Sequence, residues 1–163
     1  MRYHDITKDD MKNGDGLRVV LWMSGCSHHC PDCQNPVTWD PMDGLPFDAD
    51  ALLEIEEQLE KDYIEGITLS GGDPMYIGNR NDTLILCQYI KRVFPKKTIW
   101  MYTGYWYDDI KDHEIMKYVD VLVDGTFVKA LKDNTLKWRG SSNQRVINVP
   151  ESRKMDKICL LCD

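Results

Sequence analysis

Residues 17–36 read LRVVLWMSGCSHHCPDCQNP, and two different kinds of sequence meet in them. The first part, LRVVLWM, is rich in valine and other large apolar residues, which is typical of a buried β-strand. The second part holds cysteines at positions 26, 30 and 33, with two histidines between the first two cysteines. The stretch therefore predicts a strand that ends directly at a group of metal-binding or redox-active thiols.

The rest of the chain repeats the strand pattern and places helical periodicity between the strands. Short β-rich runs predict strands at residues 17–24, 66–70, 98–103, 119–124 and 145–149. Apolar residues at helical spacing predict helices at residues 48–63, 81–94 and 107–117, the first with Asp48 or Asp50 as its N-cap. This alternation predicts an α/β fold in which right-handed βαβ units build a largely parallel sheet.

Unusual polar and glycine-rich residues follow the other predicted strands. They are SGGDP at residues 70–74, TGY at residues 103–105 and DG at residues 124–125. Because the carboxyl ends of parallel strands lie at one edge of a sheet, where ligands gather, these segments and the cysteines are expected to form one site. The adjacent glycines Gly71 and Gly72 would let a ligand come close to the backbone.

Composition and charge narrow the class of protein. The chain has 163 residues, 42% of them hydrophobic, as expected for one globular domain with a proper core. Its 27 acidic and 20 basic residues give a net charge of −7, so nucleic-acid binding is not expected as its main function. The sequence shows neither a membrane-spanning apolar run nor a signal peptide, and we therefore expect a cytoplasmic protein.

The six cysteines indicate metal or redox chemistry rather than a disulfide framework. A structural zinc site needs four ligands, so zinc would require a loop histidine or the C-terminal pair Cys159 and Cys162 beside the three clustered thiols. An iron–sulfur cube held by three thiolates keeps one iron with an open coordination position, and Pro31 suits a loop that wraps around such a cluster. Cys87 lies at an apolar helical position and is expected in the core.

The cysteine spacing, followed by a strand that ends in Gly-Gly-Asp-Pro, resembles the radical S-adenosylmethionine (SAM) superfamily. The segments SGCSHHCPDCQNPVTWDP, TLSGGDP, WMYTGY, VDVLVDGTFV and WRGSSNQRV, in that order, further resemble the activating enzymes of anaerobic ribonucleoside-triphosphate reductase. The resemblance extends from Arg2 to about Val149 and implies an abbreviated partial (βα) barrel of the radical SAM type. It implies one radical SAM domain at residues 1–150 and a C-terminal tail of unknown role at residues 151–163.

The resemblance also implies a mechanism and a set of site residues. Cys26, Cys30 and Cys33 would ligate a [4Fe-4S] cluster, and the bare iron would chelate the methionine group of SAM. A flavodoxin-type donor would reduce the cluster, and SAM cleavage would give a 5′-deoxyadenosyl radical that takes a hydrogen atom from a glycine of the reductase. No catalytic residue is expected beyond the cluster-bound cofactor. The implied cofactor-binding residues are Asp32, Gln34, Gly71, Gly72 and Asp73.

Two further features lie at the predicted edge of the sheet. Asp124 is expected either to contact SAM or an incoming peptide, or to cap a loop. The segment GSSNQR at residues 140–145 is expected either to engage the partner or the nucleoside, or to form a polar loop before the last strand. Tryptophans at positions 39, 100, 106 and 138 are candidates for a surface that receives a protein substrate.

Alternative hypotheses keep part of this interpretation. The protein could activate another glycyl-radical enzyme, such as pyruvate formate-lyase, with the same chemistry. It could instead be a zinc-binding adaptor without turnover, with Cys159 and Cys162 binding zinc, cycling as a dithiol or forming an exposed tail. Methyl transfer from SAM without radicals is a poorer fit, because such enzymes do not require the cysteine loop.

Overall fold

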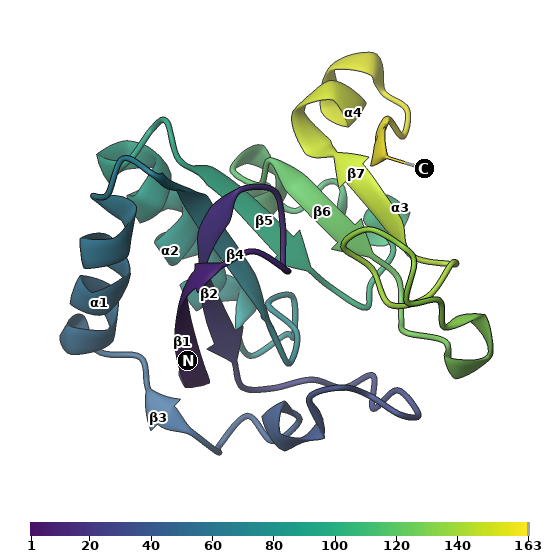
Figure 1. Cartoon of the computed structure of the whole chain (residues 1–163), viewed down its shortest axis with the longest axis horizontal. Helices are drawn as coiled ribbons and strands as arrows, with labels where there is room; N and C mark the ends of the chain where they lie inside the picture. The colour runs from purple at the N-terminus through teal and green to yellow at the C-terminus, as the bar shows by residue number, and fades with distance from the viewer. Residues whose placement is uncertain (163) are drawn as a thin grey trace.

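The computed structural model describes residues 1–162 as one eight-stranded sheet with helices packed against it (Figure 1). The strand order is β3-β1-β2-β4-β5-β6-β7-β8. The strands are β1 (Arg2–Asp10), β2 (Leu17–Met23), β3 (Leu45–Pro46), β4 (Ile64–Gly71), β5 (Thr98–Tyr102), β6 (Val121–Asp124), β7 (Arg145–Asn148) and β8 (Leu160–Cys162). The α-helices are α1 (Ala49–Leu59), α2 (Arg80–Val93), α3 (Tyr107–Ile110) and α4 (Val149–Met155), and short 3₁₀ turns lie at Pro36–Thr38, Glu114–Lys117 and Lys129–Leu131.

The prediction of a largely parallel, partial (βα) barrel is wrong. Only the pairings β2–β4, β4–β5 and β5–β6 are parallel, whereas β1–β2, β1–β3, β6–β7 and β7–β8 are antiparallel. The sheet is therefore mixed, with most of its pairings antiparallel. The physical reason is clear at the connection between β1 and β2. Residues 11–16 are too few for a parallel crossover and form a hairpin instead.

Each strand predicted from the sequence is present, but other elements were missed. Strands β1, β3 and β8 and helix α4 were not predicted, and the C-terminal strand β8 pairs with β7 as part of the same sheet. The helix predicted at residues 107–117 is broken into α3 and the 3₁₀ turn Glu114–Lys117. The break occurs where the His113 side chain accepts a hydrogen bond from the backbone N–H of Ile115 and starts the second element.

The main core lies between the sheet and helices α1 and α2, which cover one of its faces (Figure 1). Alternate residues of the central strands point into this core and are fully buried, for example Val19, Leu21 and Met23 of β2. Helix α1 begins at the predicted N-cap Asp48, whose carboxylate accepts a hydrogen bond from the Ala51 backbone N–H. Cys87 is buried in this core, as predicted.

The opposite face of the sheet carries a smaller core and a buried arginine. Trp100, Val121, Val123 and Val146 form this second cluster. Arg18 is 1% exposed and donates hydrogen bonds to Thr68 Oγ1 on β4 and to the hydroxyl and carbonyl of Thr98 on β5. Its guanidinium therefore joins three neighbouring strands on this face.

No helix among residues 1–162 combines the length and the apolar character needed to cross a lipid bilayer.

Candidate functional site

One cavity lies where β2, β4, β5 and β6 end, and it collects the segments that the sequence singled out. Its volume is about 190 Å³. The prediction that these strands bring their unusual residues to one site is thus confirmed. The residues of the cysteine loop and of the predicted strand-end segments that line the cavity are Cys26, His28, Cys30, Cys33, Gln34, Ser70, Gly71, Gly72, Asp73, Thr103, Gly104 and Gly125.

The three cysteines lie on the loop that follows β2, and their thiols are free and half-buried. The backbone N–H of Asn35 donates to the Cys33 Sγ over 3.4 Å. Burial raises the pKa of Cys26, with backbone hydrogen bonds from His28 and His29 opposing it, and burial likewise raises the pKa of Cys30. Both thiols therefore favour the neutral form until a cation offsets the cost of burying a thiolate.

The loop reaches this shape through two residues in the left-handed backbone region. His29 has a φ of 47° and Asp32 a φ of 58°. Single residues of this kind turn the chain sharply, so that the thiols on either side face one cavity. Cys33 closes the loop locally, since its N–H donates to the Cys30 carbonyl over 3.0 Å.

The donor set fits an iron–sulfur cluster better than a single zinc ion. A cluster binds each thiolate to a different iron, and three thiols on one loop around one cavity meet that need. Across residues 1–162, no three His, Cys, Asp or Glu side chains are grouped to hold a single ion. Both loop histidines have other partners: His28 pairs with Asp73, and His29 stacks on Trp39 with 4.5 Å between ring centroids.

The glycines at the end of β4 pack against the start of the cysteine loop. Gly71 has a φ of 102°, and the N–H of Gly72 donates to the Met23 carbonyl over 2.7 Å. A Cβ on Gly72 would lie 2.4 Å from the carbonyl oxygen of Gly25. The close approach that these glycines allow is therefore first of all an approach of two backbone segments. Their contact with a cofactor stays a prediction.

Asp73 is buried, and other parts of the chain occupy its carboxylate. It accepts hydrogen bonds from the Thr103 hydroxyl at 2.8 Å, the Gly104 N–H at 2.9 Å and the Met75 N–H at 2.8 Å. The His28 Nε2 lies 2.8 Å from its Oδ2. Since these contacts use both carboxylate oxygens, the side chain is engaged within the protein. Its backbone is engaged as well, because its N–H donates to the Gly25 carbonyl and its carbonyl accepts from the Tyr76 N–H. A contact of Asp73 with a cofactor stays a prediction.

The structure separates the two predicted residues that flank Cys33. Gln34 lines the cavity, but Asp32 does not, and its side chain is 61% exposed. The Asp32 carboxylate pairs with Lys129 Nζ at 2.9 Å, and this hydrogen bond holds its pKa below the usual value. A role of Asp32 in cofactor binding stays a prediction that this position does not favour.

Comparison with known proteins also indicates an iron–sulfur cluster, as the three thiols do. A family model described as a 4Fe-4S single cluster domain matches residues 12–147. The chain is 46% identical over 146 residues to the anaerobic ribonucleoside-triphosphate reductase-activating protein of Enterobacteria phage T4, covering 90% of this chain and 93% of the relative. The protein of the same name from Escherichia coli (strain K12) is 44% identical over 150 residues, covering 90% and 97%.

This chain belongs to the family of anaerobic ribonucleoside-triphosphate reductase-activating proteins. A more distant member from Vibrio cholerae is 40% identical over 148 residues, covering 88% of this chain and 96% of the relative. The chain therefore carries a 4Fe-4S single cluster domain, and the matched residues 12–147 include the whole lining of the cavity. The resemblance to the activating enzymes of anaerobic ribonucleoside-triphosphate reductase is confirmed.

The sequence did not single out two aromatic side chains that line the cavity, Trp22 on β2 and Tyr102 on β5. Trp22 is paired in register with Ser70 of β4. Trp22 and Tyr102 point to the face of the sheet opposite the helices, and their alternation with core residues was the available signal. Asn13, from the β1–β2 hairpin, gave no local signal because tertiary packing alone brings it there.

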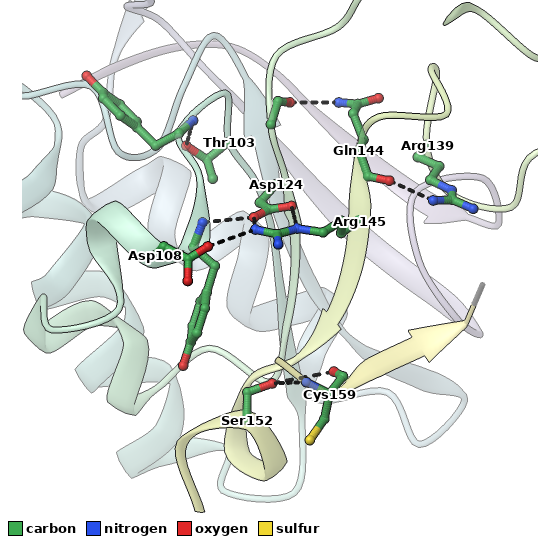
Figure 2. Close-up of polar contacts among 11 residues, drawn as sticks. Thr103, Asp108, Asp124, Arg139, Gln144, Arg145, Ser152 and Cys159 are labelled. Carbon is green, nitrogen blue, oxygen red and sulfur yellow. Dashed lines mark hydrogen bonds and ion pairs between the residues drawn. The ribbon is translucent and has the colours of Figure 1, made fainter. Parts of the chain in front are cut away.

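Asp124 is buried and faces an arginine rather than the cavity (Figure 2). Its carboxylate accepts from Arg145 Nε at 3.1 Å and Nη2 at 2.6 Å, and from the Tyr107 N–H at 2.8 Å. The hydrogen bond with Asp124 raises the pKa of Arg145 above its usual value. Asp124 therefore ties β6, β7 and α3 together, which is closer to the loop-capping alternative than to contact with SAM.

The segment at residues 140–145 is built as a rigid support for the end of β6 (Figure 2). The Gln144 side chain donates to the Gly125 carbonyl at 3.0 Å and accepts from the Gly140 N–H at 3.0 Å. The Asn143 amide donates to the Thr126 carbonyl at 2.7 Å. Gly140 and Gln144 also line the cavity, so the segment both holds and borders it.

Proposed function

We propose that this protein is a radical SAM activase that generates a glycyl radical on an anaerobic ribonucleoside-triphosphate reductase. The observation that carries the proposal is the placement of three free thiols and the Gly-Gly-Asp strand end around one cavity, in a chain of the activating-protein family. The names of the relatives supply the reductase as the partner.

Cys26, Cys30 and Cys33 would hold three irons of a [4Fe-4S] cluster and leave the fourth iron to SAM. When bound and reduced, such a cluster would supply the electron that cleaves SAM into methionine and a 5′-deoxyadenosyl radical. That radical would take a Cα hydrogen from the reductase glycine and become 5′-deoxyadenosine. The protein's own residues orient the cofactor and exclude water from a reactive radical.

The cavity offers suitable surroundings for SAM. Gly71 and Gly72 border it, and their backbone carbonyls would accept hydrogen bonds from the amino group of the methionine moiety. Gln34 lies on the same wall as the cysteines, as a polar partner for the nucleoside. The aromatic side chains of Trp22 and Tyr102 form an apolar wall that would shield a carbon radical from water.

A flavodoxin-type protein would deliver the electron, and the reaction would take place in the cytoplasm under anaerobic conditions. Neither step calls for nucleic acid, in keeping with the net charge of −7. The reductase glycine would have to reach this cavity to meet the radical.

The test is anaerobic reconstitution of the full chain with iron and sulfide, followed by addition of dithionite and SAM. We expect iron and sulfide to be incorporated and SAM to be converted to methionine and 5′-deoxyadenosine, detected by chromatography. With the anaerobic reductase present, electron paramagnetic resonance (EPR) should show a glycyl radical. Pyruvate formate-lyase in its place should give no such signal.

Serine variants of Cys26, Cys30 and Cys33 provide the controls. Each should remain folded by circular dichroism, because the cysteine loop lies outside the main core, and each should lose iron and SAM cleavage. A colourless wild-type protein with stoichiometric zinc, or iron-loaded protein that leaves SAM intact, would contradict the proposal.

A further inference from the structure

His28 is held in place on several sides, although it lies on a surface loop. It stands midway between Cys26 and Cys30, yet its side chain is 16% exposed. Its Nε2 lies 2.8 Å from Asp73 Oδ2, and its ring packs edge-on against Tyr105 with 4.7 Å between centroids. A Cβ on Gly104 would come within 2.5 Å of the imidazole, so the chain also leaves room for this ring.

The partner of His28 is itself immobile. Asp73 is 1% exposed, and its carboxylate is bound to the Thr103 hydroxyl and to the N–H groups of Met75 and Gly104. These groups belong to the ends of β4 and β5, the central strands of the sheet. The His28–Asp73 contact therefore links the first half of the cysteine loop to the most rigid part of the molecule.

The second half of the loop has a weaker attachment. Its side-chain link to the rest of the chain is the ion pair of Asp32 with Lys129, and both side chains are more than 60% exposed. Exposed pairs of this kind restrain a loop little. The buried contact of His28 is thus the side-chain anchor between the first and second cysteines, where a change of loop direction would tilt a bound cluster.

We propose that His28 and Asp73 are positioning residues that fix the cysteine loop, and with it the [4Fe-4S] cluster, in one orientation toward the cavity. The inference rests on the proposed function for its SAM-dependent readout and on the family's cluster domain for the cluster itself. Neither residue would ligate iron. Their bond would hold the loop in the one conformation that the structure shows, with the three thiols around the cavity where SAM would bind.

Wild type and four variants test this inference, each as the full chain reconstituted anaerobically. His28→Ala removes the bond to Asp73, whereas His28→Gln keeps an N–H donor near the position of Nε2. Gly104→Ala adds a Cβ that would lie 2.6 Å from the imidazole Nε2, so it displaces the ring without changing His28 itself. His29→Ala is the matched control, since His29 is the neighbouring residue of the same loop but stacks on Trp39 instead. The readouts are iron and sulfide content and the EPR spectrum of the reduced cluster, before and during titration with SAM.

Wild type, His29→Ala and His28→Gln should give one narrow EPR spectrum that changes to a second one as SAM binds. His28→Ala and Gly104→Ala should retain iron, because the thiols are intact, but show a broadened spectrum from several loop conformations. If only about a tenth of the molecules hold the competent orientation, the apparent Kd for SAM rises about tenfold.

Two results would overturn the inference. One is a His28→Ala spectrum and SAM titration that match those of wild type. The other is loss of iron in both His28→Ala and His28→Gln, which would identify the imidazole as a ligand rather than an anchor. Failure of the proposed function is distinguishable, because wild type itself would then bind no cluster or show no spectral change with SAM.

Discussion

At the scale of single residues, two carboxylates at strand ends are engaged by other parts of the chain. Asp73 ends the Gly-Gly-Asp motif and Asp124 ends β6, and both side chains are buried. Each is saturated by hydrogen bonds from neighbouring elements, which include His28 for Asp73 and Arg145 for Asp124. Burial of a carboxylate is costly unless such partners satisfy it, so these residues specify how loops and strands meet.

We predict that Arg145→Ala destabilises the protein strongly. The change leaves the fully buried Asp124 carboxylate without its cationic partner, and the free energy of unfolding should fall by about 3 kcal/mol. Urea denaturation followed by circular dichroism measures the loss. Arg153→Ala, which alters an exposed arginine on α4, is the control and should unfold as wild type does. Equal stability of the two variants would contradict the account of this ion pair.

A second prediction concerns the thiol of Cys87. Burial raises the pKa of Cys87 to about 12, so the folded protein holds this proton more tightly than the unfolded chain does. The stability that this gives is complete below the ordinary thiol pKa of 9.0 and is lost as the pH rises toward 12. Iodoacetamide at pH 9 should leave Cys87 unmodified in native protein and alkylate Cys159, as peptide mass spectrometry can show. Fast labelling of Cys87 would contradict its place in the core.

At the scale of elements, the end of β4 and the cysteine loop form one unit. The N–H of Gly72 bonds to the Met23 carbonyl and that of Asp73 to the Gly25 carbonyl, each over 2.7 Å. The His28–Asp73 contact continues this attachment beyond the first cysteine. The Gly-Gly-Asp motif thus positions the loop that carries the thiols, in addition to any contact with a cofactor.

We predict that Gly72→Ala disturbs this unit. The added Cβ would lie 2.4 Å from the Gly25 carbonyl oxygen and 2.8 Å from that of Thr38, so backbone must move. The free energy of unfolding should fall by about 2 kcal/mol, and iron uptake on reconstitution should drop several-fold. Gly78→Ala is the matched control, because its Cβ would meet only the flexible Tyr76 ring, at 3.0 Å. Full iron uptake by Gly72→Ala would show that the loop does not depend on this packing.

At the scale of the whole molecule, the sheet separates two regions. The cavity lies where β2, β4, β5 and β6 end, and its lining residues run from Asn13 to Gln144. The C-terminal elements α4 and β8 follow that range, and β8 extends the sheet beyond β7 (Figure 1). Cys162 packs against the second cluster, and neither Cys159 nor Cys162 lines the cavity. The C-terminal pair therefore lies apart from the candidate site.

This arrangement predicts that a Cys159→Ser/Cys162→Ser double variant keeps the iron and sulfide content of the wild type after reconstitution. Colorimetric iron and sulfide assays test the prediction, with the Cys30→Ser variant as the iron-deficient comparison. Loss of iron, or the appearance of bound zinc in wild type but not in the variant, would show that the C-terminal thiols bind metal after all.

The sequence by itself determined where the central strands lie, which cysteines cluster and which family the chain resembles. It could do so because strand periodicity, cysteine spacing and glycine motifs are local patterns, readable over a few residues. It did not determine that β1, β7 and β8 make the sheet mixed, because strand direction depends on connections and pairings between distant segments.

Only the tertiary structure decided which way the polar residues of the site face. The sequence offered Asp32 and Asp73 for cofactor contact, and Asp124 for ligand contact or a loop cap. The structure exposes Asp32 and pairs Asp73 with His28 and Asp124 with Arg145. These partners lie 45 and 21 residues away along the chain, so no local pattern could reveal them. The cysteine spacing in the sequence therefore indicates the chemistry of this protein, whereas the partners of its charged side chains depend on the tertiary structure.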